Sequence, residues 1–199
     1  MQLTRAALAL TIGALSLVAP SAPLEAKKTP DAAFAGQAMP PAPKPGPEHQ
    51  ILKQDEGTWD ATVEIFAAPG TPPLTSKGVE TNIVGCGGLC LITDFKGEMM
   101  PGQPFHGHGT TAYNPAKKKY VGSWTDSMST GLLVGESTYD AAAKTATGWM
   151  EGPDMTGQVT KMKSVVEYKD ADTRVFSMYG PGPDGKEGLG MRMTLKRRK

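Results

Sequence analysis

The chain of 199 residues contains only three histidines, and none of them lies in a recognisable catalytic motif. A Ser-His-Asp triad would have to use His49, His106 or His108 without any local signature to support it. The sequence also lacks a G-x-S-x-G elbow, a G-x-x-x-x-G-K-[ST] loop and an H-E-x-x-H helix. These absences exclude the common hydrolase and nucleotide-binding signatures. The sequence assigns no reaction; it favours a binding protein and leaves an enzyme as the alternative.

Neither sign of charge is in excess, because 21 Lys and Arg residues are balanced by 20 Asp and Glu residues. Such a balance produces no field that would attract nucleic acid, and we expect no nucleic-acid partner. The basic block "KRRK" at residues 196–199 is interpreted as a solvated chain end, with a phosphate-binding tail as the alternative. "GHGTTA" satisfies the dinucleotide pattern G-x-G-x-x-A, but the turn sequence "YNPAKKK" follows where that motif needs a helix.

Long apolar runs are also missing, except for one of thirteen residues at 6–18. This run follows Arg5 and precedes the small-residue stretch "APSAPLEA", which is the order of a secretory signal peptide. It is too short to span a bilayer of roughly 30 Å, although a retained anchor is the alternative. We predict a signal peptide at residues 1–26, a periplasmic or secreted mature protein, and no membrane span after its removal.

Two further regions follow the predicted signal peptide. Residues 27–47 are rich in Ala, Pro and Lys and are predicted to form a flexible linker. Residues 48–199 form one domain, which opens with a short helix in "PEHQILKQDEG". The rest is typical of β-strands, since Val, Thr, Tyr, Phe and Trp alternate with turn residues. The predicted strands are 59–66, 74–84, 89–96, 105–113, 119–127, 132–139, 145–151, 158–168, 174–179 and 187–196.

The connections between these strands indicate an up-and-down order. "YNPAKKKY", "YDAAAKT", "YKDADTR" and "YGPGPDGKE" each lead a tyrosine-ended strand into a turn. A meander of about ten antiparallel strands must protect its edges, and closure into a barrel removes them. A barrel of this size can enclose a small ligand. We predict an all-β, up-and-down antiparallel barrel with a short N-terminal helix, and a two-sheet sandwich is the alternative.

"GTW" at residues 57–59 resembles the Gly-x-Trp signature of calycin barrels, which include lipocalins, fatty-acid-binding proteins and nitrobindin-like proteins. The resemblance implies that Trp59 plugs one barrel end and that an arginine of the last strand, Arg192 or Arg197, packs across it. The run from "PEHQILKQDEGTW" through "GTTAYNPAKKKYVGSWTDSM" to "MRMTLKRRK" resembles the bacterial family called domain of unknown function 1579. That family supplies a fold but no reaction.

His106 and His108 lie two apart and therefore share one face of a predicted strand. We favour the edge of a binding cavity for them. The alternative is a transition-metal site with Glu98, which would suit zinc or iron, or with Met99 and Met100, which would suit copper. No cofactor is expected otherwise. Haem is not expected, because nitrobindin-like barrels ligate iron through a histidine near the C-terminal strands and this chain has none after His108.

Cys86 and Cys90 flank "GGL" between two predicted strands. In an oxidising compartment they would form a disulfide, and the alternative is two small buried thiols. Their C-x-x-x-C spacing differs from that of redox-active pairs.

"YVGSWTDSM" is the candidate ligand site, because alternation places Tyr120, Trp124, Asp126 and Met128 on one face. Aromatic walls with an acid and a thioether are typical of small-molecule pockets. An inward Asp126 needs a partner, for which Arg174 or Arg192 is available. Methionines on other predicted strands suit either an adaptable cavity or an irregular core: Met150, Met162, Met178, Met191 and Met193.

These features favour a secreted or periplasmic barrel that binds a small apolar molecule. One alternative is a metal-dependent protein or enzyme that uses His106 and His108. Another is an envelope structural or assembly protein with a solidly packed barrel. The oligomeric state is not predicted.

Overall fold

A computed structural model of the chain describes residues 41–68, 70–154, 156–182 and 185–199. The predicted signal peptide and most of the predicted linker lie outside the described residues. The described elements, in chain order, are η1 (Pro47–His49), α1 (Gln50–Asp55), β1 (Gly57–Ile65), β2 (Leu74–Gly85), η2 (Cys86–Gly88), β3 (Cys90–Met100), β4 (Gln103–Asn114), β5 (Lys119–Asp126), β6 (Leu133–Asp140), β7 (Thr145–Pro153), β8 (Val159–Tyr168), β9 (Thr173–Pro181) and β10 (Glu187–Arg197).

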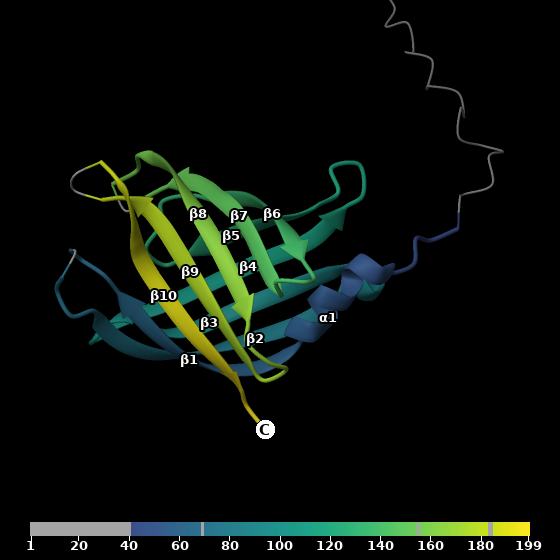
Figure 1. Cartoon of the computed structure of the whole chain (residues 1–199), viewed down its shortest axis with the longest axis horizontal. Coiled ribbons are helices and arrows are strands. Elements are labelled where there is room, and N and C mark those ends of the chain that lie inside the picture. The colour runs from purple at the N-terminus through teal and green to yellow at the C-terminus, as the bar shows by residue number, and fades with distance from the viewer. Residues whose placement is uncertain (1–40, 69, 155, 183–184) are drawn as a thin grey trace, which may run out of the picture. The chain divides into compact units, whose positions relative to one another are not determined.

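The ten strands form a closed barrel in which each strand pairs with its neighbour in sequence (Figure 1). The first strand, β1, pairs antiparallel with the last, β10, from Trp59 opposite Arg197 to Ile65 opposite Met191. This closing pair leaves no free sheet edge, which is the stabilising advantage of a barrel over an open meander. The predicted all-β up-and-down barrel is confirmed, and the sandwich alternative is wrong.

All ten predicted strands overlap observed strands, but the hairpin of β3 and β4 is longer than the sequence indicated. The prediction ended one strand at residue 96 and began the next at 105, whereas β3 continues to Met100 and β4 begins at Gln103. A tight turn at Pro101 and Gly102 joins them, and Gly102 adopts the left-handed φ of 77° that favours glycine. The segment of Glu98 to Met100 is therefore strand, with a register irregularity, rather than loop.

One end of the barrel is covered by α1, which packs beside β2 and β3 (Figure 1). Its apolar side chains Ile51 and Leu52 are buried in a cluster with Leu91 of β3 and Tyr168 of β8. Burial of these apolar groups fixes the short helix, which has too few turns to be stable alone. In the described part of the chain, no helix has the length and apolar character needed to cross a membrane.

Trp59 lies just beyond α1 and is 1% exposed. Its indole N–H donates to the carbonyl oxygen of Asp55 at 2.9 Å, which ties the end of the helix to β1. The guanidinium groups of Arg197 and Arg174 lie 4.1 and 4.5 Å from the ring centroid. Of the two predicted partners, Arg197 therefore packs on Trp59, whereas Arg192 lies over a different aromatic ring. The contact of Arg174 with Trp59 was not predicted, because Arg174 belongs to β9 rather than to the last strand.

The two cysteines are joined in a disulfide between Cys86 and Cys90, one of the two arrangements that the sequence left open. Gly87 and Gly88 carry the chain between them with φ values of 67° and 94°, which glycine adopts without steric cost. The bridge closes the turn from β2 to β3 at the end of the barrel that α1 covers.

Candidate functional site

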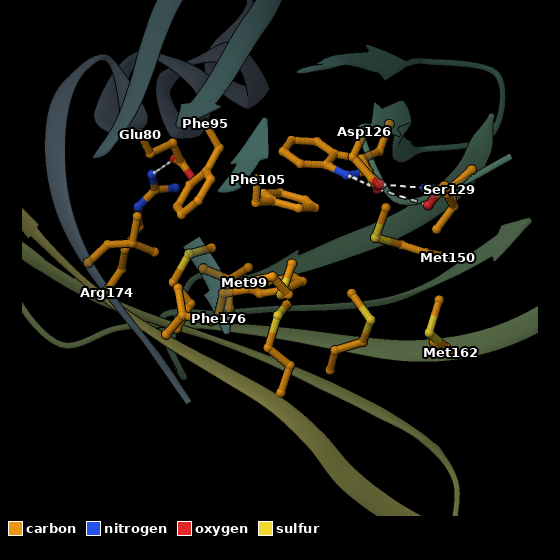
Figure 2. Close-up of a pocket in the computed structure, with 18 residues that line it drawn as sticks. Glu80, Phe95, Met99, Phe105, Asp126, Ser129, Met150, Met162, Arg174 and Phe176 are labelled. Carbon is orange, nitrogen blue, oxygen red and sulfur yellow. Dashed lines mark hydrogen bonds and ion pairs between the residues drawn. The ribbon is translucent and has the colours of Figure 1, made fainter. Parts of the chain in front are cut away.

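The barrel encloses a cavity of about 330 Å³. Its lining comes from inward positions of every strand and from Ser129 (Figure 2). Most of the lining is apolar, and its three charged side chains are Glu80, Asp126 and Arg174. The other lining residues are Val63, Phe95, Met99, Phe105, Trp124, Leu133, Met150, Met162, Val166, Phe176, Met178, Met191, Met193 and Leu195.

Six methionines line this cavity, more than any other residue type. Five of them were among the strand methionines singled out from the sequence, and Met99 is the sixth. Met128 packs against a second buried core cluster and does not line the cavity. That cluster consists of Trp59, Ala61, Val63, Phe95, Phe105 and Leu195. Unbranched thioether side chains change rotamer readily, so these walls can adapt to ligands of different shape.

On β5 the structure places Trp124 and Asp126 in the cavity lining, as the predicted alternation requires, while Thr125 between them is exposed. Tyr120 lies further along the same face, toward α1. Its hydroxyl donates to the carbonyl oxygen of Glu48 at 2.7 Å, and burial raises its pKa to about 12. Tyr120 does not line this cavity, but it lines a smaller pocket beside it.

Asp126 has a different set of partners from the one we predicted. One carboxylate oxygen accepts hydrogen bonds from the backbone N–H groups of Met128 and Ser129, both at 2.8 Å. The other accepts from the Trp124 indole N–H and from the Ser129 hydroxyl, both at 3.0 Å. Neither Arg174 nor Arg192 contacts it, so the predicted ion pair is wrong. The turn after β5 provides three of these four donors, and the Asp126 carboxylate that they hold fixes the Trp124 ring through the fourth.

The glycines of "HGHG" explain why the neighbouring histidines miss the cavity. Gly107 and Gly109 face the barrel interior, where the Trp124 indole lies directly against them. An added Cβ would come within 2.1 Å of this ring at Gly107 and 2.7 Å at Gly109, so any side chain would displace it. His106 and His108 alternate with these glycines and are exposed on the outer face. They do not form the edge of the cavity.

On that outer face the histidines approach a single carboxylate. Nδ1 of His108 lies 3.0 Å from Oδ1 of Asp94, and Nε2 of His106 lies 3.9 Å from the same oxygen. Glu98 points to the turn instead, where it accepts a hydrogen bond from the Gly102 N–H at 3.1 Å. Within the described ranges, no group of three or more His, Cys, Asp and Glu side chains is arranged to hold a metal ion.

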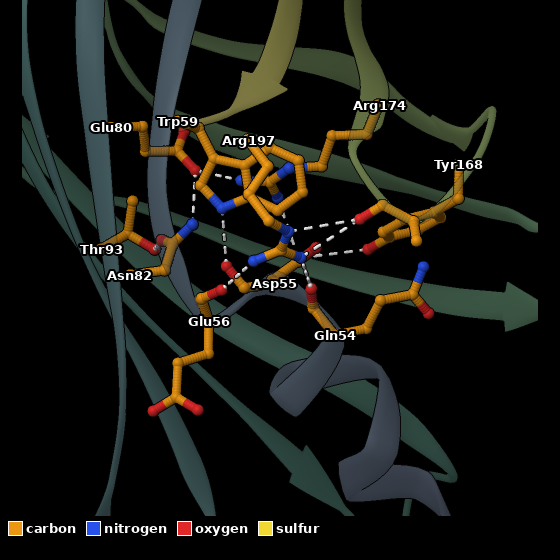
Figure 3. A network of polar contacts seen from close by, with 11 residues as sticks. Gln54, Asp55, Glu56, Trp59, Glu80, Asn82, Thr93, Tyr168, Arg174 and Arg197 are labelled. Atoms are coloured by element: carbon orange, nitrogen blue, oxygen red, sulfur yellow. Dashed lines mark hydrogen bonds and ion pairs between the residues drawn. The ribbon is translucent and has the colours of Figure 1, made fainter. Parts of the chain in front are cut away.

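Arg174 is buried at the end of the cavity nearest Trp59, where it joins two acidic side chains (Figures 2 and 3). It pairs with Glu80, and its Nη1 lies 2.9 Å from Oδ2 of Asp55. The side-chain amide of Asn82 donates a hydrogen bond at 2.7 Å to Oε1 of Glu80, the oxygen that also pairs with Arg174. One cation thus neutralises only part of the charge of two buried carboxylates. Nη1 and Nη2 of Arg174 are taken by Asp55 and Glu80, while its Nε is buried without a hydrogen-bond partner among the described residues.

Asp55 has an unusual protonation behaviour for a group so close to an arginine. Burial raises its pKa to about 6, and this outweighs the opposite effect of Arg174. The Tyr168 hydroxyl donates to Oδ2 of Asp55 at 3.1 Å, while Oδ1 has no hydrogen-bond partner. The same burial, together with the charge of Asp55, strongly raises the pKa of Tyr168.

The chain matches the family described as "protein of unknown function (DUF1579)" over residues 44–197. The protein belongs to this family. No curated protein sequence matches it. Among solved structures, this DUF1579 protein is similar to the crystal structure of Rv2717c from M. tuberculosis, with 12% identity and a TM-score of 0.58 over 77% of this chain and 99% of the other. It is also similar to the S-type phycobiliprotein lyase CPES from Guillardia theta, with 11% identity and a TM-score of 0.52 over 76% and 93% of the two chains. At these identities the similarity establishes the barrel fold alone.

The part of the site that depends on long-range strand register is not predicted by the sequence pattern. Glu80, Phe95 and Phe105 line the cavity, and Glu80 and Arg174 meet although 94 residues separate them. The alternation within β2 and β3 would identify their inward faces. Which inward residue meets which depends on the stagger of a closed barrel, which no local pattern encodes.

Proposed function

We propose that this DUF1579 protein is exported and binds a small, mostly apolar molecule inside its barrel. The observation that carries the proposal is the cavity of about 330 Å³ lined by methionine and aromatic side chains. Ligand pockets typically measure roughly 300–1,000 Å³ and combine an apolar lining with a few fixed polar groups. Export is supported only by the sequence of residues 1–26, which has the order of a signal peptide.

The polar groups of the cavity are fixed before any ligand arrives. Asp126 is held by four hydrogen bonds, and Arg174 by its pairs with Asp55 and Glu80. A pre-organised lining reduces the entropy that binding would otherwise cost. The cavity also argues against the alternative of a solidly packed structural barrel, since an interior void loses dispersion contacts and stability unless something occupies it.

The experiment is a titration of the purified mature protein with the apolar dye N-phenyl-naphthylamine, followed by dye fluorescence. Met178→Trp should fill the cavity from its wall and weaken binding at least about tenfold. Val134→Trp is the matched control, because Val134 is 46% exposed on the outer face of β6. Saturable dye binding that is kept by Val134→Trp and lost in Met178→Trp supports the proposal. Equal binding by both variants would place the dye outside the barrel.

A further inference from the structure

A second, smaller pocket of about 170 Å³ lies beside the first within the barrel. Trp124 and Met150 line both pockets, so these two side chains form the boundary between them. Thr93 and Thr111 of the second pocket lie two residues from Phe95 and Gly109 on the inner faces of β3 and β4. The second pocket is therefore a lateral extension of the barrel interior and not a groove on its surface.

Small residues open this extension. Ser137 of β6 and Ser164 of β8 both lie opposite Gly148 of β7, which forms one row across three strands. In the next rows, Gly122 lies opposite Thr111 and Gly135. A Cβ at Gly148 would lie 2.6 Å from that of Ser137, so the backbone packs closely where side chains are absent. Gly109, Gly122 and Gly135 line the pocket together with the hydroxyl-bearing side chains of Thr111, Ser137 and Ser164.

Three of these hydroxyl groups have no protein partner among the described residues. In the part of the chain that the structure describes, the side chains of Thr111, Ser137 and Ser164 make no hydrogen bond to another protein group. Among the described residues, the buried side-chain atoms without a hydrogen-bond partner are Asp55 Oδ1 and Arg174 Nε. The three hydroxyl groups are therefore not fully buried, and they are accessible from the pocket that their residues line. Each hydroxyl can donate and accept, which suits an uncharged polar group.

The charges around both pockets disfavour an anion. The only cation that lines the larger cavity is Arg174, counted over the described residues, and it already pairs with Asp55 and Glu80. Asp126 adds another carboxylate. In the smaller pocket the only charged side chain among the described residues is Glu136, which pairs with two lysines on the outer surface. A ligand carboxylate would remain without a counter-charge in either pocket, and burying such a charge is costly.

Building on the proposed function, we infer that the ligand is a neutral amphiphile: its apolar chain occupies the methionine-lined cavity and its hydroxyl-bearing head passes Trp124 into the smaller pocket. Thr111, Ser137 and Ser164 bind the head by hydrogen bonds. The arrangement selects against the fatty acid with the same chain, although that acid would fill the apolar cavity equally well.

The test compares three competitors with one acyl chain: monooctanoylglycerol, methyl octanoate and octanoate. Each displaces N-phenyl-naphthylamine from the full mature protein at neutral pH. We expect the glyceride to bind about tenfold more tightly than the ester, because hydrogen bonds to the head distinguish them. Octanoate should bind more weakly than both. In the double variant Ser137→Ala/Ser164→Ala, the preference for the glyceride over the ester should fall to within about twofold.

The control is Thr138→Ala/Thr147→Ala, which removes two exposed hydroxyl groups that face each other on the outside of the same sheet. It should keep the wild-type preference. Because preference is a ratio of affinities measured within one protein, a loss of folded protein does not change it. Octanoate binding as tightly as the glyceride, or a preference that survives in the inner double variant, would overturn the inference. Absence of dye binding in the wild type would instead refute the proposed function itself.

Discussion

Replacement of Trp59 by alanine tests the packing that closes the barrel. The side chain is 1% exposed, its indole N–H bonds the Asp55 carbonyl, and guanidinium groups lie 4.1 and 4.5 Å from its ring. Emptying a large aromatic from a core costs about 3–5 kcal/mol. Loss of the cation–π contacts adds about 0.5–2 kcal/mol. We therefore expect Trp59→Ala to lower the free energy of unfolding by at least about 3 kcal/mol.

Two variants separate the contributions to this value in urea denaturation. Trp59→Phe keeps a ring under the arginines but loses the N–H donor, so it should cost about 1–2 kcal/mol. Trp149→Ala is the matched control: this half-buried ring contacts Lys161 at 4.1 Å but belongs to neither buried core cluster. It should cost about 1 kcal/mol. A loss below about 1 kcal/mol for Trp59→Ala, or one equal to that of Trp149→Ala, would refute the closure by Trp59.

Three further perturbations test other parts of the structure. Gly107→Ala should destabilise the protein by about 1–3 kcal/mol because its Cβ meets an indole ring, whereas Gly188→Ala, with open space around it, should stay within about 0.5 kcal/mol in the same denaturation assay. His106→Gln/His108→Gln should leave stability and metal content by mass spectrometry unchanged, and stoichiometric wild-type metal lost in the variant would contradict this. Because the folded-state pKa of Asp55 is raised to about 6, its protonated form stabilises the fold below about pH 4, and that contribution is lost as pH rises to about 6. Asp55→Asn should flatten this slope, and an unchanged slope in urea denaturation would exclude Asp55 as its source.

Local pattern was sufficient to predict the fold of this chain. Strands that end in tyrosine and lead into short polar turns occur in order along the sequence, and such hairpins pair neighbours without long-range information. Because side chains alternate between the two faces of a strand, the sequence also placed Trp124 and Asp126 on one face of β5, and the structure has both in the cavity lining. The same period identifies one face for His106 and His108 but does not say whether that face is inside. The inward glycines at 107 and 109 carried that information, because a bulky ring needed the space beside them.

The partners of buried charges were harder to predict. Asp126 is satisfied by the turn that follows it, a local arrangement that "TDSMS" contains, because aspartate commonly accepts hydrogen bonds from N–H groups two and three residues ahead. The pairing of Arg174 with Asp55 and Glu80 brings together a helix, β2 and β9. Only the stagger of the closed barrel determines such contacts.

Native mass spectrometry of the mature protein with N-phenyl-naphthylamine tests the central claim most directly, because it counts the molecules bound to each folded chain. Wild type and Val134→Trp should each form a complex with one dye molecule, and the cavity-filled Met178→Trp should form little or none. A complex of equal abundance in all three proteins, or none in any of them, would contradict a ligand-binding cavity inside the barrel.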